Sequence, residues 1–187
     1  KMRIKGKPIS YRRKLQGKTN YKKRMILLSS KKVRLVVRRS INNFVAQLVN
    51  YKKEGDIVLV SVNSYSLKKL GWKAHRGNTP TAYLTGLLLG KKAKDKGVKE
   101  AILDLGLHNS IEKNSLYAIL KGVIDSGIEV NHGNNIFPSE DRIQGKHIVE
   151  FMRKNENKLQ FSRYEKSNLN YENFIEHFNQ IKNKILT

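Results

Sequence analysis

The segment Val33-Arg34-Leu35-Val36-Val37-Arg38-Arg39 alternates between apolar and basic side chains. An alternation of period two is typical of a β-strand that buries one face, here the face of Val33, Leu35 and Val37. Arg34 and Arg38 fall on the opposite face, where they are expected to present charge. The segment therefore predicts the first strand of a sheet.

Two more strands are predicted directly after it. Residues 40–43 read as a turn, and Phe44–Tyr51 alternates again. Gly55-Asp56 reads as a second turn, followed by a third and more buried strand over Ile57–Val62. Three strands joined by such short connections predict an antiparallel meander.

The pattern then changes to helical spacing. Asn78-Thr79-Pro80 predicts a helix start with Thr79 as the N-cap and Pro80 in the first helical position, and Gly97 ends that helix. An apolar strand over Ala101–Leu107 follows. The remaining expected elements are a helix capped by Ser115 and ending at Asp125 before Gly127, a strand over Ile128–Val130, and short helices from Pro138 and over Lys146–Arg153.

This order predicts an α/β fold: one mixed sheet that opens with the meander, with helices packed on it. We expect a basic arm over residues 1–30, an α/β domain over 31–153, and a linker with an amphipathic C-terminal helix over 154–187. Asn155–Asn170 reads as a polar linker. The helix after it carries Phe174, Phe178 and Ile181 on one face, so it either docks on the domain or binds a partner.

The charge of the chain points to an anionic partner. Lys and Arg number 38 against 15 Asp and Glu, a net charge of +23 over 187 residues. Of the basic residues, 18 lie between Lys1 and Lys53, and the first acid is Glu54. Such asymmetry is typical of an arm that binds RNA or a membrane surface. The absence of cysteine excludes disulfides and thiol chemistry, and no apolar run reaches the roughly 20 residues that cross a bilayer.

The densest part of this charge is the segment Tyr11–Arg24, YRRKLQGKTNYKKR. Lys and Arg neutralise phosphates, and Tyr and Arg planes can stack on unpaired bases. The segment therefore predicts RNA binding, although a solvated leader, or a solvated sheet face around Arg34 and Arg38, would have a similar composition.

Other motifs in the sequence give weaker indications of function. Gly86–Lys92 resembles a phosphate-binding loop but has the wrong spacing and lies in a predicted helix. No metal-ligand spacing connects the histidines. The acids are scattered, most of them at predicted turns and helix ends, so we expect no metal, no cofactor and no enzyme activity. The residues concerned are His75, His108, His132, His147, His177, Asp56, Asp104, Glu112, Asp125, Glu140 and Asp141.

Several segments together resemble the archaeal and eukaryotic branch of the family of large-subunit ribosomal protein eighteen. They are Tyr11–Leu28, Arg34–Tyr51, Gly71-Trp72, Asn78–Lys92, Ile102–Leu107, Lys121–Gly127 and Pro138–Ile148. The resemblance fades after about Arg153. The family commonly has acids where this chain has Gln16 and Asn20, and it often has a glycine that the loop Asn109–Asn114 lacks.

The resemblance implies a ribonuclease H-like motif and a structural role in the large subunit of cytoplasmic ribosomes. It implies binding of 5S rRNA, with large-subunit rRNA and other ribosomal proteins as neighbours and no membrane. From the basic segment and the resemblance together we predict RNA contacts at Tyr11, Arg12, Arg13, Lys14, Lys18, Thr19, Tyr21, Lys22, Lys23, Arg24, Arg34, Arg38, Arg39, Asn42, Asn43, His75 and Arg76.

Two other functions compete with this one. A ribonuclease H-like nuclease needs clustered carboxylates for two metal ions, whereas the first predicted strand carries arginines and no acid. A membrane-surface protein would use the C-terminal helix, but Glu172 and Glu176 give that helix a poor face for anionic lipid.

Overall fold

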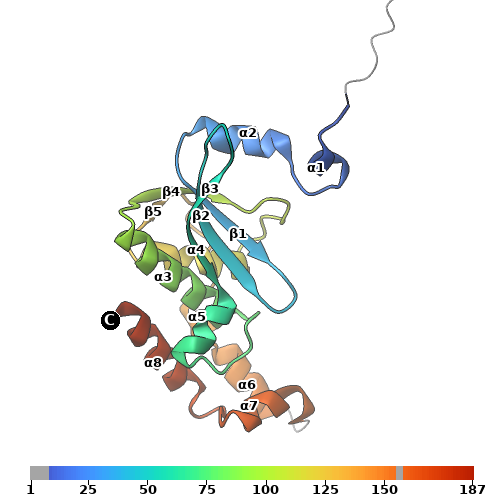
Figure 1. Ribbon diagram of the computed structural model, residues 1–187. Coiled ribbons are helices and arrows are strands. Elements are labelled where there is room, and N and C mark those ends of the chain that lie inside the picture. Colours follow the sequence, from blue (N-terminus) through green and yellow to red (C-terminus); the bar gives the residue numbers. More distant parts are fainter. Residues whose placement is uncertain (1–8, 155–157) are drawn as a thin grey trace, which may run out of the picture.

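The structure, a computed structural model, describes residues 9–154 and 158–187. The described residues form a five-stranded sheet in the order β3-β2-β1-β4-β5 (Figure 1). β1 to β3 form the predicted antiparallel meander, and β4 and β5 continue it in parallel. The strands are β1 (Arg34–Arg39), β2 (Phe44–Asn50), β3 (Ile57–Asn63), β4 (Glu100–Asp104) and β5 (Glu129–Val130). The predicted mixed α/β sheet is confirmed.

One face of the meander carries the core. The register sets Leu35 opposite Leu48 and Val37 opposite Ala46, and all four side chains are fully buried, as is that of Phe44. They belong to one hydrophobic cluster with residues of α3 (Thr79–Asp95) and α4 (Ser115–Asp125). The alternation in the sequence therefore identified the buried face correctly.

Two predicted strands differ from the observed ones. β3 is less buried than expected, because it is the edge strand of the sheet, and Ile57 and Val58 are 41% and 49% exposed. β4 ends at Asp104 rather than at Leu107. There the Asp104 carboxylate accepts a hydrogen bond from the backbone N–H of Gly106 (2.8 Å), whose positive φ of 59° turns the chain away from the sheet.

Asparagines cap the two long helices one residue earlier than predicted. The Asn78 side chain accepts a hydrogen bond from the backbone N–H of Thr81 (2.9 Å), so Thr79 is the first helical residue and Pro80 the second. Asn114 likewise caps α4, in place of Ser115. An N-cap accepts from the second or third helical N–H, and both asparagines reach it. The predicted glycine ends, Gly97 and Gly127, have the left-handed backbone expected of them.

Glycines let α3 and α4 pack backbone against backbone. A Cβ on Gly86 would lie 2.0 Å from the carbonyl oxygen of Ile119, and one on Gly122 would lie 2.2 Å from that of Tyr83. The motif Gly86–Lys92 is thus part of α3, and its first glycine serves helix packing.

The C-terminal segment is folded onto the same core. Its elements are α5 (Glu140–Gln144), α6 (Lys146–Lys154), η2 (Lys158–Phe161), α7 (Ser162–Lys166) and α8 (Phe174–Leu186). The prediction of a polar linker over Asn155–Asn170 is therefore wrong for its helical part, residues 158–166, and for Leu169, which is buried in the core. Residues 155–157 lie outside the described part of the chain.

α8 docks on α3, which settles the alternative that the sequence left open (Figure 1). Its apolar face, including Phe174 and Phe178, is buried. The indole of Trp72 lies edge-on to both rings and stacks on His177, with ring centroids 5.2 Å apart. The buried Trp72 Nε1 donates a hydrogen bond to Thr81 (2.7 Å), so α8, the loop and α3 are held together at one point.

We expect the substitution Gly86→Ala to lower the free energy of unfolding by at least about 1–3 kcal/mol, because the added methyl must push apart two packed helix backbones. Gly133→Ala is the matched control, since its Cβ would meet nothing nearer than 3.6 Å and should change stability by less than about 0.5 kcal/mol. Urea unfolding followed by circular dichroism measures both. Equal stability of the two variants would contradict the close approach.

Candidate nucleic-acid interface

The N-terminal arm is partly helical and lies outside the core. Its described part, residues 9–30, holds α1 (Arg12–Leu15) and α2 (Tyr21–Ser29), and neither helix buries a residue. Gly17, with a φ of 61°, turns the chain between them, and Asn20 caps α2 by accepting from the backbone N–H of Lys23. In Figure 1 the arm reaches beyond the edge of the sheet. Its basic side chains are therefore open to a partner.

Contacts within the arm give it a shape of its own. Arg13 Nε donates a hydrogen bond to the Thr19 hydroxyl (2.9 Å), and the rings of Tyr11 and Tyr21 lie 4.9 Å apart at 36°. Of these residues, Tyr11 remains 70% exposed. The predicted contact residues of α1 and α2 are thus brought together on one short structure.

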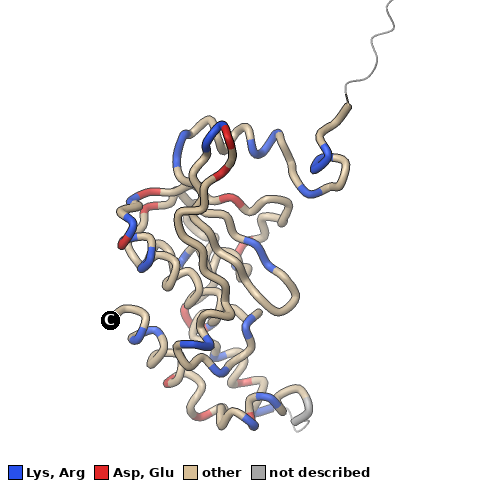
Figure 2. Tube along the Cα trace, viewed as in Figure 1, with Lys and Arg blue, Asp and Glu red and all other residues tan. Residues whose placement is uncertain are grey.

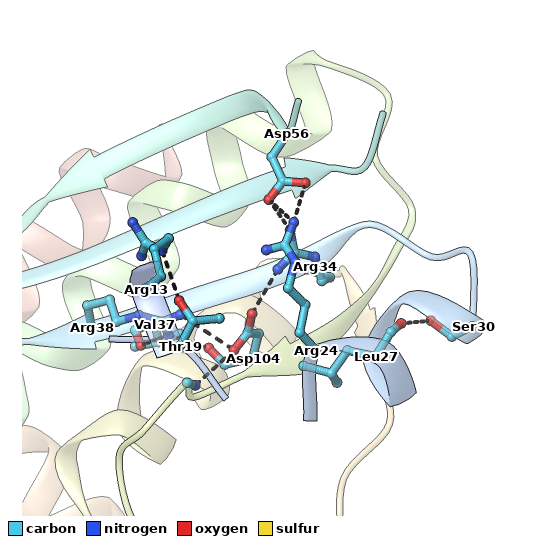
Figure 3. Close-up of polar contacts among 11 residues, drawn as sticks. Arg13, Thr19, Arg24, Leu27, Ser30, Arg34, Val37, Arg38, Asp56 and Asp104 are labelled. Carbon is cyan, nitrogen blue, oxygen red and sulfur yellow. Dashed lines mark hydrogen bonds and ion pairs between the residues drawn. The ribbon is translucent and has the colours of Figure 1, made fainter. Parts of the chain in front are cut away.

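A chain of ion pairs fastens the arm to the sheet (Figure 3). Arg24 of α2 holds both oxygens of Asp56, at 2.9 and 2.8 Å. Asp56 also pairs with Arg34 of β1 (2.6 Å), Arg34 with Asp104 of β4 (2.9 Å), and Asp104 with Arg38 at 3.5 Å. This ion-pair chain, Arg24–Asp56–Arg34–Asp104–Arg38, connects α2, the turn before β3, and two strands.

The expectation that Arg34 presents charge on the sheet surface is wrong. Its side chain is 3% exposed and lies between two carboxylates. Its Nε has no hydrogen-bond partner among the described residues. A buried guanidinium is tolerated only when it is paired, so in this structure Arg34 is a clamp between Asp56 and Asp104, turned away from solvent.

The arginines also set the ionisation of Asp56. Partial burial by itself would raise the pKa of this carboxyl group. The hydrogen bond from Arg24 and the charge of Arg34 outweigh that effect, and the pKa lies below its ordinary value. Asp56 is therefore charged at neutral pH and holds both arginines.

A small polar cavity of about 100 Å³ lies where the arm meets the sheet. Basic side chains dominate its wall, and Asp104 is the single acid among the described residues there. The basic residues are Arg13, Lys18, Lys23, Arg24 and Arg38. Such a convergence of cations is suited to the oxygens of a phosphate group.

The predicted residues of β1 and of the loops beyond it are spread more widely. Arg39 is exposed at the end of β1, and Arg38, half-buried, donates to the backbone carbonyls of Val37 and Asp104. Asn42 and Asn43 lie on the β1–β2 turn, away from the arm. Asn42 lines a second, larger cleft together with His75 and Arg76. The structure thus divides the predicted contacts into an arm group and a group at the opposite end of β1.

Sequence reasoning missed the two acids that organise the first group. The sequence predicts Asp56 in a turn and Asp104 within a strand, and it predicts no ion pair for either, yet each pairs with arginines. The partner Arg34 lies 22 residues before Asp56 and 70 before Asp104. No local signal identifies a pair so distant in sequence, because the sheet register alone sets β1 beside β4.

The described part of the chain holds neither a cluster suited to a metal ion nor a helix suited to spanning a membrane. No group of three or more His, Asp or Glu side chains is placed there to hold a metal ion. Among the same residues, no helix is long and apolar enough to cross a membrane.

The fold and this surface define a class: an α/β protein that carries an exposed basic arm clamped to its sheet, as nucleic-acid-binding proteins do. Comparison with known families makes the class specific. Residues 6–100, about half of the chain, match the family described as ribosomal large subunit proteins 60S L5 and 50S L18. The chain belongs to this family of rRNA-binding components of the large ribosomal subunit. The match covers the arm, the meander and α3, and confirms the resemblance noted in the sequence.

We expect Asp104→Asn to lower the free energy of unfolding by about 3–5 kcal/mol, because it leaves the buried Arg34 short of one counter-charge. Asp141→Asn removes the same charge from an exposed pair with Lys146, whose side chains are 68% and 48% exposed, and should cost about 0–1 kcal/mol. Denaturant titration of both variants checks this. A similar small effect at both sites would mean that the ion-pair chain adds nothing to stability.

The docking of α2 should depend on pH through Asp56. Since the folded pKa of Asp56 is lowered, its contribution is complete above its ordinary value of about 4 and is lost as pH falls through the folded pKa. NMR signals of α2 backbone amides should therefore shift below pH 4. In Asp56→Asn the same amides should already show the loosened state at pH 7, with no further acid transition of their own. Signals of Asp56→Asn that match the wild type at pH 7 would contradict the clamp.

Proposed function

We propose that this protein binds 5S rRNA and attaches it to the large-subunit rRNA of a cytoplasmic ribosome. The observation that carries the proposal is the basic arm, which is exposed and is fastened to the folded domain by Arg24 and Asp56. An arm held in this way presents its cations in a defined direction, which a free leader would not do.

Phosphate contacts would supply most of the affinity. Arg12, Lys14, Lys18, Lys22 and Lys23 are exposed on the described arm, and each neutralised phosphate releases counterions into solution. The cavity beside Arg13 and Arg38 offers one place where a phosphate group would meet several cations at once.

Base contacts would come from the rings. Tyr11 is exposed beside Tyr21, so one ring supports the other against an unpaired base. Arg24 has a double role in this proposal, since an RNA phosphate that approaches it competes with Asp56. Arg34 is left out of the proposed contacts because it is buried.

The alternative of a ribonuclease H-like nuclease is the weaker proposal. The strand order β3-β2-β1-β4-β5 is compatible with the ribonuclease H-like motif as a fold. A two-metal site needs free carboxylates, whereas the Asp104 carboxylate is engaged by Arg34, Arg38 and the Gly106 N–H. A structural role without catalysis fits these contacts better.

Neighbouring ribosomal proteins are the further partners that we propose. Met25 and Ile26 on α2 are 70% and 71% exposed. Such exposed apolar side chains, next to the basic first turn of the helix, favour contact with another macromolecule.

We expect the full chain to bind 5S rRNA more tightly than a tRNA of similar charge. If the chain neutralises about 6–10 phosphates, affinity falls roughly 10³- to 10⁵-fold between 50 and 200 mM salt. Replacing Arg12, Lys14 and Lys18 together by Ser should reduce the slope of log affinity against log salt by about 2–3. Filter binding over a salt series measures this.

The control is the replacement of Lys92, Lys96 and Lys99 by Ser, which removes the same charge from exposed positions around the end of α3. It should leave the slope nearly unchanged. Equal losses in the two triple variants would show that only net charge matters, and equal affinity for tRNA would refute specificity for 5S rRNA.

A further inference from the structure

A second cleft lies at the end of the molecule away from the arm. It has a volume of about 1190 Å³ and two walls. One wall is η1 (Ser64–Leu70) with the loop Gly71–Asn78, and the other is the C-terminal segment from His147 to Ser167. The backbone N–H of His75 donates a hydrogen bond to the Tyr164 hydroxyl (3.1 Å), which joins the walls. The second wall lies beyond residue 100, where the family match ends.

The cleft is positively charged. No Asp or Glu is among the described residues that line it, and no lining Lys or Arg forms an ion pair with another described residue. Figure 2 shows several Lys and Arg positions, with a few Asp and Glu positions between them, at this end of the molecule. The lining cations are Lys68, Lys73, Arg76, Arg163 and Lys166. Burial and the charges of Arg76 and Arg163 lower the pKa of His75, so this imidazole is neutral at pH 7.

Aromatic rings lie among these cations. Phe151 of α6 is 48% exposed although its helix buries Val149 in the core. Its ring lies edge-to-face on Phe161 (5.8 Å, 61°), and Phe161 lies in the same way on Tyr164 (5.7 Å, 61°). This row of rings supports Phe151 from one side and leaves nearly half of its surface open. In addition, the buried Nδ1 of His147, also on the wall, has no hydrogen-bond partner among the described residues.

We propose that this cleft binds an unpaired segment of RNA, with a base stacked on Phe151 and the adjoining phosphates held by Lys68, Arg76, Arg163 and Lys166. A supported aromatic ring beside cations that form no ion pair with another described residue is the combination that single-stranded nucleic acid requires. Ordinary small-molecule pockets hold about 300–1,000 Å³, so this volume suits a strand better than a metabolite. An acidic peptide would match the cations but has no flat group for Phe151.

This site goes beyond the proposed binding of 5S rRNA, because it uses no arm residue and involves no particular RNA. Its length on the nucleic acid would be about 4–16 nucleotides. It would give the chain two RNA contacts at opposite ends, one through the arm and one through the C-terminal segment.

The test uses the full chain and a labelled single-stranded RNA of about eight nucleotides that contains 4-thiouridine. Photocrosslinked peptides should map to residues 147–167 as well as to the arm. Phe151→Ala should weaken the cleft contact roughly 5- to 150-fold, from the loss of one stacked base. Phe151→Trp should restore it. Arg163→Glu should weaken it and make it less sensitive to salt, because one phosphate contact is lost.

The matched controls change the same chemistry away from the cleft. Ile111→Ala shortens another exposed apolar side chain, and Lys96→Glu reverses a charge at the far end of α3, roughly 25 Å along that helix from Asn78. Both should crosslink at residues 147–167 as the wild type does. Circular dichroism of every variant verifies that the fold is intact.

Crosslinks confined to the arm, or unchanged cleft crosslinking in Phe151→Ala and Arg163→Glu, would overturn the proposal. The proposal would also be overturned if Phe151→Ala and Arg163→Glu lost binding to a polyglutamate peptide while they kept the RNA crosslink. The cleft would then be a protein site. The variant in which Arg12, Lys14 and Lys18 are replaced by Ser separates the two functions. It should lose affinity for 5S rRNA and keep the cleft crosslink. Failure of 5S rRNA binding alone would leave the cleft contact standing.

Discussion

The placement of Arg34 between Asp56 and Asp104 is the constraint on which the functional surface depends. A guanidinium buried in the sheet must be paired, and its two carboxylates come from different parts of the fold. Asp56 precedes the edge strand and Asp104 ends the parallel strand. Because Asp56 also holds Arg24, the same charge balance that makes the sheet stable fastens the arm to it. Stability and the direction of the arm are therefore coupled through one residue pair.

Two groups of cations in this protein differ in what neutralises them. Those of the ion-pair chain are neutralised within the fold and serve its architecture. Those on the arm and around the second cleft have no such partners among the described residues, so their repulsion is relieved by an anionic ligand. RNA is the ligand that we propose for both surfaces, in keeping with the ribosomal protein family to which the chain belongs. The 38 Lys and Arg thus overstate the number of cations available for binding, since some of them are paired with acids inside the molecule.

The C-terminal segment adds a second surface to the part of the chain that matches the family. α8 closes over Trp72 and α3, and α6 and α7 build a wall opposite the loop of His75 and Arg76. A loop that would otherwise be open on one side becomes half of a cleft with aromatic and basic walls. The segment that least resembles the family thereby adds a surface to it.

The sequence by itself determined the class of fold, the buried face of the meander and the family, and it showed the concentration of basic residues before Glu54. These follow from local alternation, capping residues and charge asymmetry, which operate over a few residues. It predicted Arg34 to be exposed and to contact RNA. It placed Asp56 in a turn, Asp104 within a strand, and residues 158–166 in a linker. Only the tertiary structure decided those, because a buried charge is recognised by a partner 22 or 70 residues away. The cleft around Phe151 was hidden for the same physical reason: its two walls meet only when α6 and α7 fold back beside residues 71–78.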